Sequence, residues 1–282
     1  MRPRRLRDPF PPLLLTLALL TPTLLAGCRD GRDEPALPHP ATRVLSLVPS
    51  VTEIVVRLGA AEVLVGRTDY DTLAVLRDLP STGGGLGPDL EVVRALEPQV
   101  VIAFAGESDP RTGPALEGLG IPVLAVRPDR LADVPRIIRE VGALVGRDAR
   151  AAELVAELEA ELEAVRAAVA ERPRVRAVYL LGGSPPLAAG PGSFISDLLT
   201  VAGATNALDD LPGLYAPVGT EVLLTREIDV ILTTRGSRID PRVRSGRRTV
   251  EMPAWVEIPG PALGRAAWTV ARALHPGLDG GG

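Results

Sequence analysis

The sequence has only two histidines, His39 in a proline-rich stretch and His275 near the C-terminus. A histidine-based catalytic triad and a metal site with several histidine ligands are therefore not expected. Lysine is absent and every basic residue is arginine, which we attribute to the base composition of the genome rather than to function. Aromatic residues make up only 3% of the chain, so the position of each one is informative.

The composition is that of a globular protein with room for two hydrophobic cores. The chain has 282 residues, of which 46% are hydrophobic and 23% are charged, and its formal net charge is -4. Residues 1–27 hold four of the 31 basic and one of the 35 acidic residues, so 27 basic residues face 34 acidic ones from Cys28 onward. This acidic balance argues against a nucleic-acid backbone as the main partner.

The first 27 residues are predicted to be a lipoprotein signal peptide. A basic start precedes an apolar run from Leu13 to Leu25, which has the length of a signal-peptide core and is short for a membrane span. The run ends in Leu-Ala-Gly-Cys, which resembles a bacterial lipobox, and Cys28 is the only cysteine. The alternative is a chance cysteine after an ordinary leader. We expect lipid on Cys28 to anchor the chain to a membrane, and residues 28–42, polar and rich in proline, to form a flexible tether.

A long helix is predicted over residues 148–172. This stretch has no glycine and is rich in strong helix formers, and its apolar residues recur at steps of three and four. Asp148 is expected to cap its start, and Pro173 to stop it. The helix separates two segments, 43–147 and 173–282, in which strands and helices alternate. That alternation predicts two α/β lobes with parallel sheets.

The two predicted lobes repeat one pattern. PDLEVVRALEPQVVIA in the first parallels VGTEVLLTREIDVILT in the second, each being a short helix with an early acidic residue followed by a buried strand. In the first lobe, Ser50 and Glu53 have the spacing of a capping box at the start of a helix. The glycine-rich loop at 80–88 lacks the lysine and the spacing of a phosphate-binding loop, so no nucleotide site is expected.

Taken together, these segments resemble the solute-binding proteins of ABC importers, in the class that carries cobalamin, haem and iron-siderophores. The resemblance runs from Arg43 to Pro276, and RVLSLVPSVTEIVVRLGA and VGRTDY are most similar to the cobalamin branch. It implies an α/β fold of two Rossmann-like lobes with parallel sheets joined by one long α-helix, that of a class III solute-binding protein. It also implies a monomer without enzymatic activity or cofactor. Such a protein works outside the cytoplasmic membrane, binds a large planar ligand in the interlobe cleft, and delivers it to an ABC permease dimer with its ATPase subunits.

The resemblance also assigns roles to individual residues. It implies that Glu91 and Glu221, one in each lobe, dock on arginines of the permease; the alternative is that each carboxylate merely favours a helix N-terminus. It implies ligand contacts at four aromatic positions and at Gly84, where relatives often carry tryptophan. The four aromatic positions are Tyr70, Phe104, Tyr215 and Trp255. Ala262 stands where an arginine is common in relatives, so the exact corrinoid stays open.

Other functions remain as alternatives. Haem would need an axial ligand, which Tyr70 or Tyr215 could supply. An anionic iron-siderophore would need a basic cleft, for which Arg67, Arg127 and Arg235 are available. A sensor that reports ligand to a membrane kinase could use the same fold. A hydrolase is disfavoured, because the sequence around Ser193 is not G-x-S-x-G and no histidine lies within either lobe's sheet.

Overall fold

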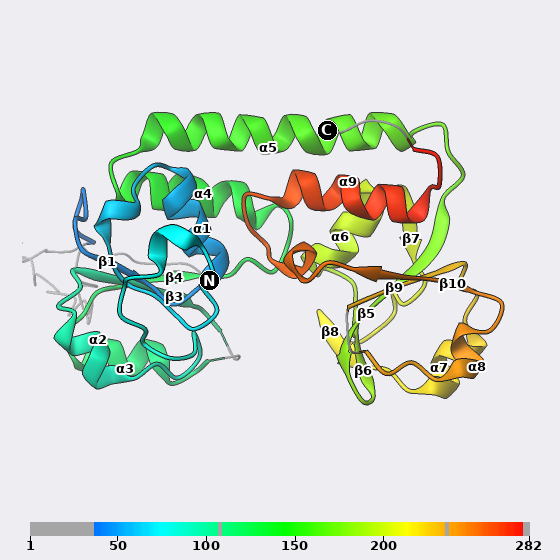
Figure 1. Ribbon diagram of the computed structural model, residues 1–282, viewed down its shortest axis with the longest axis horizontal. Coiled ribbons are helices and arrows are strands. Elements are labelled where there is room, and N and C mark those ends of the chain that lie inside the picture. The colour runs from blue at the N-terminus through cyan, green and yellow to red at the C-terminus, as the bar shows by residue number, and fades with distance from the viewer. Residues whose placement is uncertain (1–36, 107–108, 235–236, 279–282) are drawn as a thin grey trace, which may run out of the picture. The chain divides into compact units, whose positions relative to one another are not determined.

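The computed structural model describes residues 37–106, 109–234 and 237–278, which belong to one unit of the chain (Figure 1). The predicted signal peptide and Cys28 lie outside the described residues. In the part that is described, no helix has both the length and the apolarity needed to cross a bilayer.

The first sheet has four parallel strands in the order β2-β1-β3-β4, as predicted. Its central strands β1 and β3 are almost wholly buried, which fits their continuous runs of Val, Leu and Ile. The strands are β1 (Val44–Ser46), β2 (Leu64–Gly66), β3 (Val100–Phe104) and β4 (Val123–Val126). The helices of this lobe are α1 (Pro49–Arg57), α2 (Leu90–Ala95), α3 (Thr112–Gly118) and α4 (Asp133–Leu144).

The second sheet is mixed, whereas the prediction was of a parallel sheet. Its order is β10-β9-β5-β6-β8, with β7 also paired to β5. The pairs β5–β9, β9–β10 and β5–β7 are parallel, but β6 runs antiparallel to β5 and β8, because the chain reverses in a tight turn at Gly183–Pro186. The strands are β5 (Val175–Gly183), β6 (Pro186–Ala189), β7 (Ala204–Asn206), β8 (Tyr215–Pro217), β9 (Val230–Thr234) and β10 (Arg248–Met252). The helices are α6 (Phe194–Val201), α7 (Thr220–Thr225), α8 (Pro241–Arg244), the short 3-10 helix η3 (Ala254–Glu257) and α9 (Leu263–Leu274).

The predicted long helix is α5, Asp148–Val169. It begins at Asp148, which is the first helical residue and not the cap, and it ends three residues before the predicted boundary. It lies along α4 of the first lobe and α9 of the second (Figure 1). Its buried stripe joins residues of both lobes into one hydrophobic cluster. The stripe consists of Ala151, Leu154, Val155, Leu158, Leu162, Val165 and Val169.

Two glycines allow the close packing of α5. A Cβ added to Gly142 in α4 would collide with the Cβ of Ala151, and one added to Gly264 in α9 would collide with the side chain of Glu161, its Cβ lying 2.5 Å away. Real Cβ atoms do not approach so closely. Both neighbouring helices therefore approach α5 at positions where only glycine fits without movement.

The predicted internal repeat is confirmed. Helix α2 begins at Leu90 and strand β3 at Val100, while α7 begins at Thr220 and β9 at Val230. The burial of Glu91 to Val100 and of Glu221 to Val230 follows nearly the same order of exposed and buried positions. The two halves of the chain thus place an acidic first turn and a buried central strand in corresponding positions.

Candidate functional site

Tyr70 and Gly84 lie side by side on two loops that are hydrogen bonded to each other. Asp69 N donates to Gly83 O at 2.8 Å, and Thr82 N donates to Arg67 O at 2.9 Å. A Cβ added to Gly84 would lie 3.9 Å from Cε2 of Tyr70. The Tyr70 side chain is 71% exposed, so its ring is available to a ligand beside Gly84.

Phe104 and Arg127 follow the ends of neighbouring strands of the same sheet. Phe104 closes β3 and pairs in register with Val126 of β4, and Arg127 comes next. Phe104 is half-buried against the core, whereas the Arg127 guanidinium is exposed and forms an ion pair with Asp129, with Nε donating to Oδ2 at 2.9 Å. The carboxyl ends of parallel strands share one edge of a sheet, and this edge is where α/β proteins bind ligands.

Tyr215 in β8 provides the corresponding exposed aromatic residue of the second lobe. Burial raises the pKa of its phenol, and the carboxylates of Asp129 and Glu257 raise it further. Asp129 belongs to the segment after β4 in the first lobe, so the Tyr215 phenol lies close to groups of both lobes. Its side chain remains 37% exposed.

Trp255 is less open than the other predicted ligand residues. It lies in η3, is half-buried and packs against the core. The guanidinium of Arg265 is centred 4.1 Å from the ring centroid, a cation–π contact that covers one face of the indole. A ligand could stack only on its other face unless Arg265 moved.

Next to Tyr215 the structure holds a buried polar pair that the sequence did not predict. The Tyr179 side chain in β5 is 1% exposed, and neither its hydroxyl nor Oε1 of Glu257 has a well-formed hydrogen bond among the described residues. The two groups are nevertheless close enough for each to affect the pKa of the other. Burial raises the pKa of Glu257, and its contacts with Tyr179 and Thr234 lower it again in part. In the sequence, Glu257 has the surroundings of an ordinary surface acid.

The raised pKa of Glu257 predicts how folding stability depends on pH. The native state binds the proton of the Glu257 carboxyl group more tightly than the unfolded state does. The contribution of this proton to folding stability is therefore complete below the ordinary pKa of 4.5, and it is lost as the pH rises through the raised pKa. Glu257→Gln keeps the neutral form at every pH, and we expect its Tm to fall less than that of the parent between pH 4 and pH 8. Thermal unfolding across this range measures the effect.

Glu159→Gln is the matched control, because the Glu159 side chain on α5 is 60% exposed. Its pH profile should follow that of the parent. If the Glu257→Gln profile also ran parallel to the parent's, the carboxyl would not be perturbed in the way described.

Glu91 and Glu221 are both exposed in the first turn of a short helix. Asp89 caps α2 through hydrogen bonds from the backbone N–H of Glu91 at 2.9 Å and of Val92 at 3.2 Å. Helix α7 starts instead after Gly219, without a side-chain cap. In Figure 1, α2 and α7 lie on the side of the view opposite α5.

The structure also bears on the alternative functions. Ser193 is fully buried at the N-cap of α6, where its hydroxyl donates to Gly190 O at 2.8 Å, so it is not presented as a nucleophile. Arg67 extends from the end of β2 with its Nε buried and unpaired among the described residues, and Arg235 lies outside them. Within the described ranges, no group of three or more His, Cys, Asp or Glu side chains could hold a metal ion.

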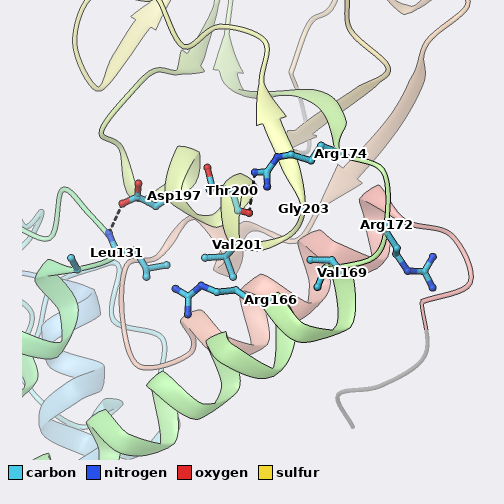
Figure 2. A pocket seen from close by; sticks show the side chains of 11 residues that line it. Leu131, Arg166, Val169, Arg172, Arg174, Asp197, Thr200, Val201 and Gly203 are labelled. Carbon is cyan, nitrogen blue, oxygen red and sulfur yellow. Dashed lines mark hydrogen bonds between the residues drawn. The ribbon is translucent and has the colours of Figure 1, made fainter.

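A cavity of about 450 Å³ lies where the end of α5 meets α6, and none of the predicted ligand residues lines it (Figure 2). Three arginines from α5 and the following segment contribute to its walls, together with Leu131 of the first lobe and Asp197 of α6. This cavity is distinct from the aromatic site.

Comparison with known proteins identifies the family. The family model for periplasmic binding proteins matches residues 44–254. The vitamin B12-binding protein of Vibrio cholerae is 25% identical over 229 residues, covering 78% of this chain and 76% of its own. The high-affinity heme uptake system protein IsdE of Staphylococcus aureus is 26% identical over 223 residues, covering 77% and 75%.

A solved structure shows the same fold. The periplasmic vitamin B12 binding protein BtuF of Vibrio cholerae superposes with a TM-score of 0.73 at 22% identity, covering 84% of this chain and 98% of that one. The fold is that of a class III solute-binding protein, with one parallel and one mixed sheet joined through α5. These relatives carry a ligand, and no cofactor is implied. The chain belongs to the periplasmic binding protein family.

Proposed function

We propose that this protein is the solute-binding component of an ABC importer and that it captures a corrinoid, most simply cobalamin, between its two lobes. The observation that carries the proposal is the placement of exposed aromatic rings on both lobes, with Tyr70 in the first and Tyr215 in the second. The similarity to vitamin B12-binding proteins supports this ligand class. The activity is binding and release, with no covalent chemistry.

The chemistry of these residues suits a large flat ligand. Aromatic rings stack on planar macrocycles, and binding pockets are mostly apolar with a few polar groups that fix orientation. Tyr70, Phe104, Tyr215 and the free face of Trp255 would supply the apolar contacts. Glu257 and the Arg127–Asp129 ion pair would supply the polar ones.

Haem is the second candidate, and the two tyrosines favour it. An axial ligand to haem iron can be a tyrosine; Tyr70 is 71% exposed, whereas Tyr215 is 37% exposed with its phenol largely buried. Arg67 and Arg127 could pair with carboxylates on the ligand. One of the relatives is named for heme uptake.

Calorimetric titration tests the proposal directly. The chain starting at Arg29, which keeps the whole described unit, would be titrated with cyanocobalamin, cobinamide and haemin. Sub-micromolar binding of a corrinoid is the expected result. Tight binding of haemin with a Soret shift, and no binding of either corrinoid, would replace the corrinoid proposal with haem.

Two variants at Tyr215 separate stacking from iron ligation. Tyr215→Ala is expected to weaken corrinoid binding by about 1–3 kcal/mol, the scale of a lost aromatic anchor. Tyr215→Phe keeps the ring and is expected to bind the corrinoid within a few-fold of the parent. If Phe and Ala were equally damaging, the hydroxyl and not the ring would be the important group. Under the haem alternative, with Tyr215 as the axial ligand, the Phe variant would lose the haemin spectrum.

We also propose that lipid on Cys28 anchors the protein on the outer side of the cytoplasmic membrane or at the cell surface, supported by the lipobox-like sequence before it. Mass spectrometry of the mature protein should show a diacylglyceryl group on an N-terminal Cys28. Cys28→Ser should release the protein from membranes, since stable anchoring depends on the acyl chains. A mature chain that begins elsewhere and carries no lipid would refute the anchor.

A further inference from the structure

We infer that Asp197 is a positioning residue that sets the spacing of the two lobes at one end of the ligand cleft. The effect of Asp197 on ligand binding rests on the proposed function, whereas the contacts that Asp197 makes between the lobes do not. Asp197 lies in the first turns of α6 in the second lobe, and its carboxylate bonds to the backbone of the first lobe.

Two hydrogen bonds join the segment 129–131, which follows β4, to the start of α6. Leu131 N donates to Oδ2 of Asp197 at 3.0 Å, and Phe194 N donates to the carbonyl oxygen of Asp129 at 2.7 Å. We call these two bonds the interlobe clasp. The participants are 66 and 65 residues apart in sequence, and the clasp needs no part of α5 to connect them.

A third contact reinforces the clasp. A Cβ added to Gly192, just before α6, would lie 2.8 Å from a terminal nitrogen of Arg130. Gly192 has φ +78°, a conformation that favours glycine, so the arginine packs directly over bare backbone. Three consecutive residues of the first lobe, 129 to 131, thus all contact the N-terminal end of α6 or the turn before it.

The clasp lies between the cleft and the linking helix. On the cleft side, Asp129 pairs with Arg127 and acts on the Tyr215 phenol. On the other side, Leu131 and Asp197 form part of the wall of the cavity shown in Figure 2, whose opposite wall is the end of α5 around Arg166 and Val169. The clasp therefore ties the lobes at a place separate from α5.

Two connections between the lobes restrict their relative motion more than a single connection does. A single helix would let the lobes bend and twist about its end, whereas a second attachment leaves chiefly a rocking motion about the line through both. A cleft held at nearly the right width binds a rigid ligand with less loss of conformational freedom. A larger fraction of the ligand-free molecules then has the conformation that binds the ligand, and the apparent affinity rises in proportion to this fraction.

The carboxylate of Asp197 has a role that a helix-capping acid would not have. Ser193 already caps α6, accepting from Ser196 N at 3.2 Å. Asp197 Oδ2 instead accepts from an N–H outside its own helix. A purely local role would stabilise α6 without affecting the relation of the lobes, and this difference can be measured.

The experiment compares three variants in a chain that starts at Arg29 and so has no cysteine of its own. Nitroxide labels on Glu117→Cys in α3 and Arg244→Cys in α8, both exposed, report the interlobe distance by pulsed electron resonance. Asp197→Ala removes the acceptor. Asp197→Asn keeps an acceptor oxygen for Leu131 N. Asp89→Ala is the matched control, because Asp89 Oδ1 accepts from Glu91 N at 2.9 Å within the first lobe and outside the segment 129–131.

We expect Asp197→Ala to broaden the distance distribution of the ligand-free protein and to raise the Kd for cyanocobalamin roughly 3- to 10-fold, by loss of preorganisation. Asp197→Asn and Asp89→Ala should keep the narrow distribution and the parent affinity. A distribution in Asp197→Ala as narrow as the parent's, with only a lower Tm, would overturn the inference. Because the distances are measured without ligand, they decide on the clasp even if the parent binds no corrinoid, which would count only against the proposed function.

Discussion

Replacing Gly264 with alanine is expected to lower the free energy of unfolding by about 1–3 kcal/mol, the usual penalty for overpacking a tight contact. The new methyl group would lie 2.5 Å from the Cβ of Glu161 and 2.8 Å from its Cδ. The carboxylate can swing away, but the Cβ is fixed to the backbone of α5, so the two helices must separate. This loss should exceed the roughly 1 kcal/mol that alanine gains over glycine in a helix.

Gly118→Ala is the control for this prediction. Gly118 is also helical, at the end of α3, and nothing lies within 4 Å of an added Cβ. We expect this variant to be neutral or slightly more stable than the parent. Urea unfolding of both variants gives the comparison. If Gly264→Ala were as stable as Gly118→Ala, then α9 would not be packed tightly against Glu161 of α5 at this point.

Reversing the charge of both proposed docking residues is expected to reduce transport strongly and to leave ligand binding unchanged. Glu91→Arg with Glu221→Arg would place like charges against the arginines that the proposal assigns to the permease, and such juxtapositions cost several kcal/mol. Transport in a reconstituted system should therefore fall roughly tenfold or more. Titration should give an unchanged Kd, because both residues are exposed on α2 and α7, outside the proposed ligand site.

The control for charge reversal is Glu159→Arg with Glu163→Arg. These residues are also exposed glutamates on a helix, but they lie on α5, opposite α2 and α7 in Figure 1. They make only surface ion pairs, with Arg139 and Arg166, which contribute little to stability. Normal transport by the Glu91 and Glu221 double variant, or an equal loss in the control, would refute the docking roles.

The parts of the fold that the sequence predicted are those specified by local patterns. The α5 stripe and the two helix–strand repeats each follow from spacing within a few residues. The predicted capping box at Ser50 was wrong, because Pro49 already occupies the first turn and the helix starts after Val48. A proline is favoured at that position, since it needs no hydrogen-bond partner for its nitrogen.

The mixed second sheet could not be read from the same patterns. The apolar runs of β5 and β6 are compatible with either direction of pairing, and the antiparallel arrangement depends on the short turn between them. The cation–π contact of Arg265 with Trp255 could not be predicted from the sequence either, because Arg265 lies ten residues further on in another helix. The closeness of Glu257 to Tyr179 brings together η3 and β5, which are distant in sequence. The resemblance therefore named the aromatic positions, of which Tyr70 and Tyr215 are exposed, but not the polar groups Tyr179 and Glu257.

The repeat of α2–β3 in α7–β9 has a consequence for assembly with a two-fold symmetric partner. One chain cannot match a symmetric dimer perfectly, but a chain whose halves share a helix with an acidic first turn comes close. On the docking proposal, turning the protein by half a turn above the permease exchanges the roles of Glu91 and Glu221. Two orientations would then be nearly degenerate. A ligand held between the halves stays near the axis in both, so delivery would not depend on which orientation is taken.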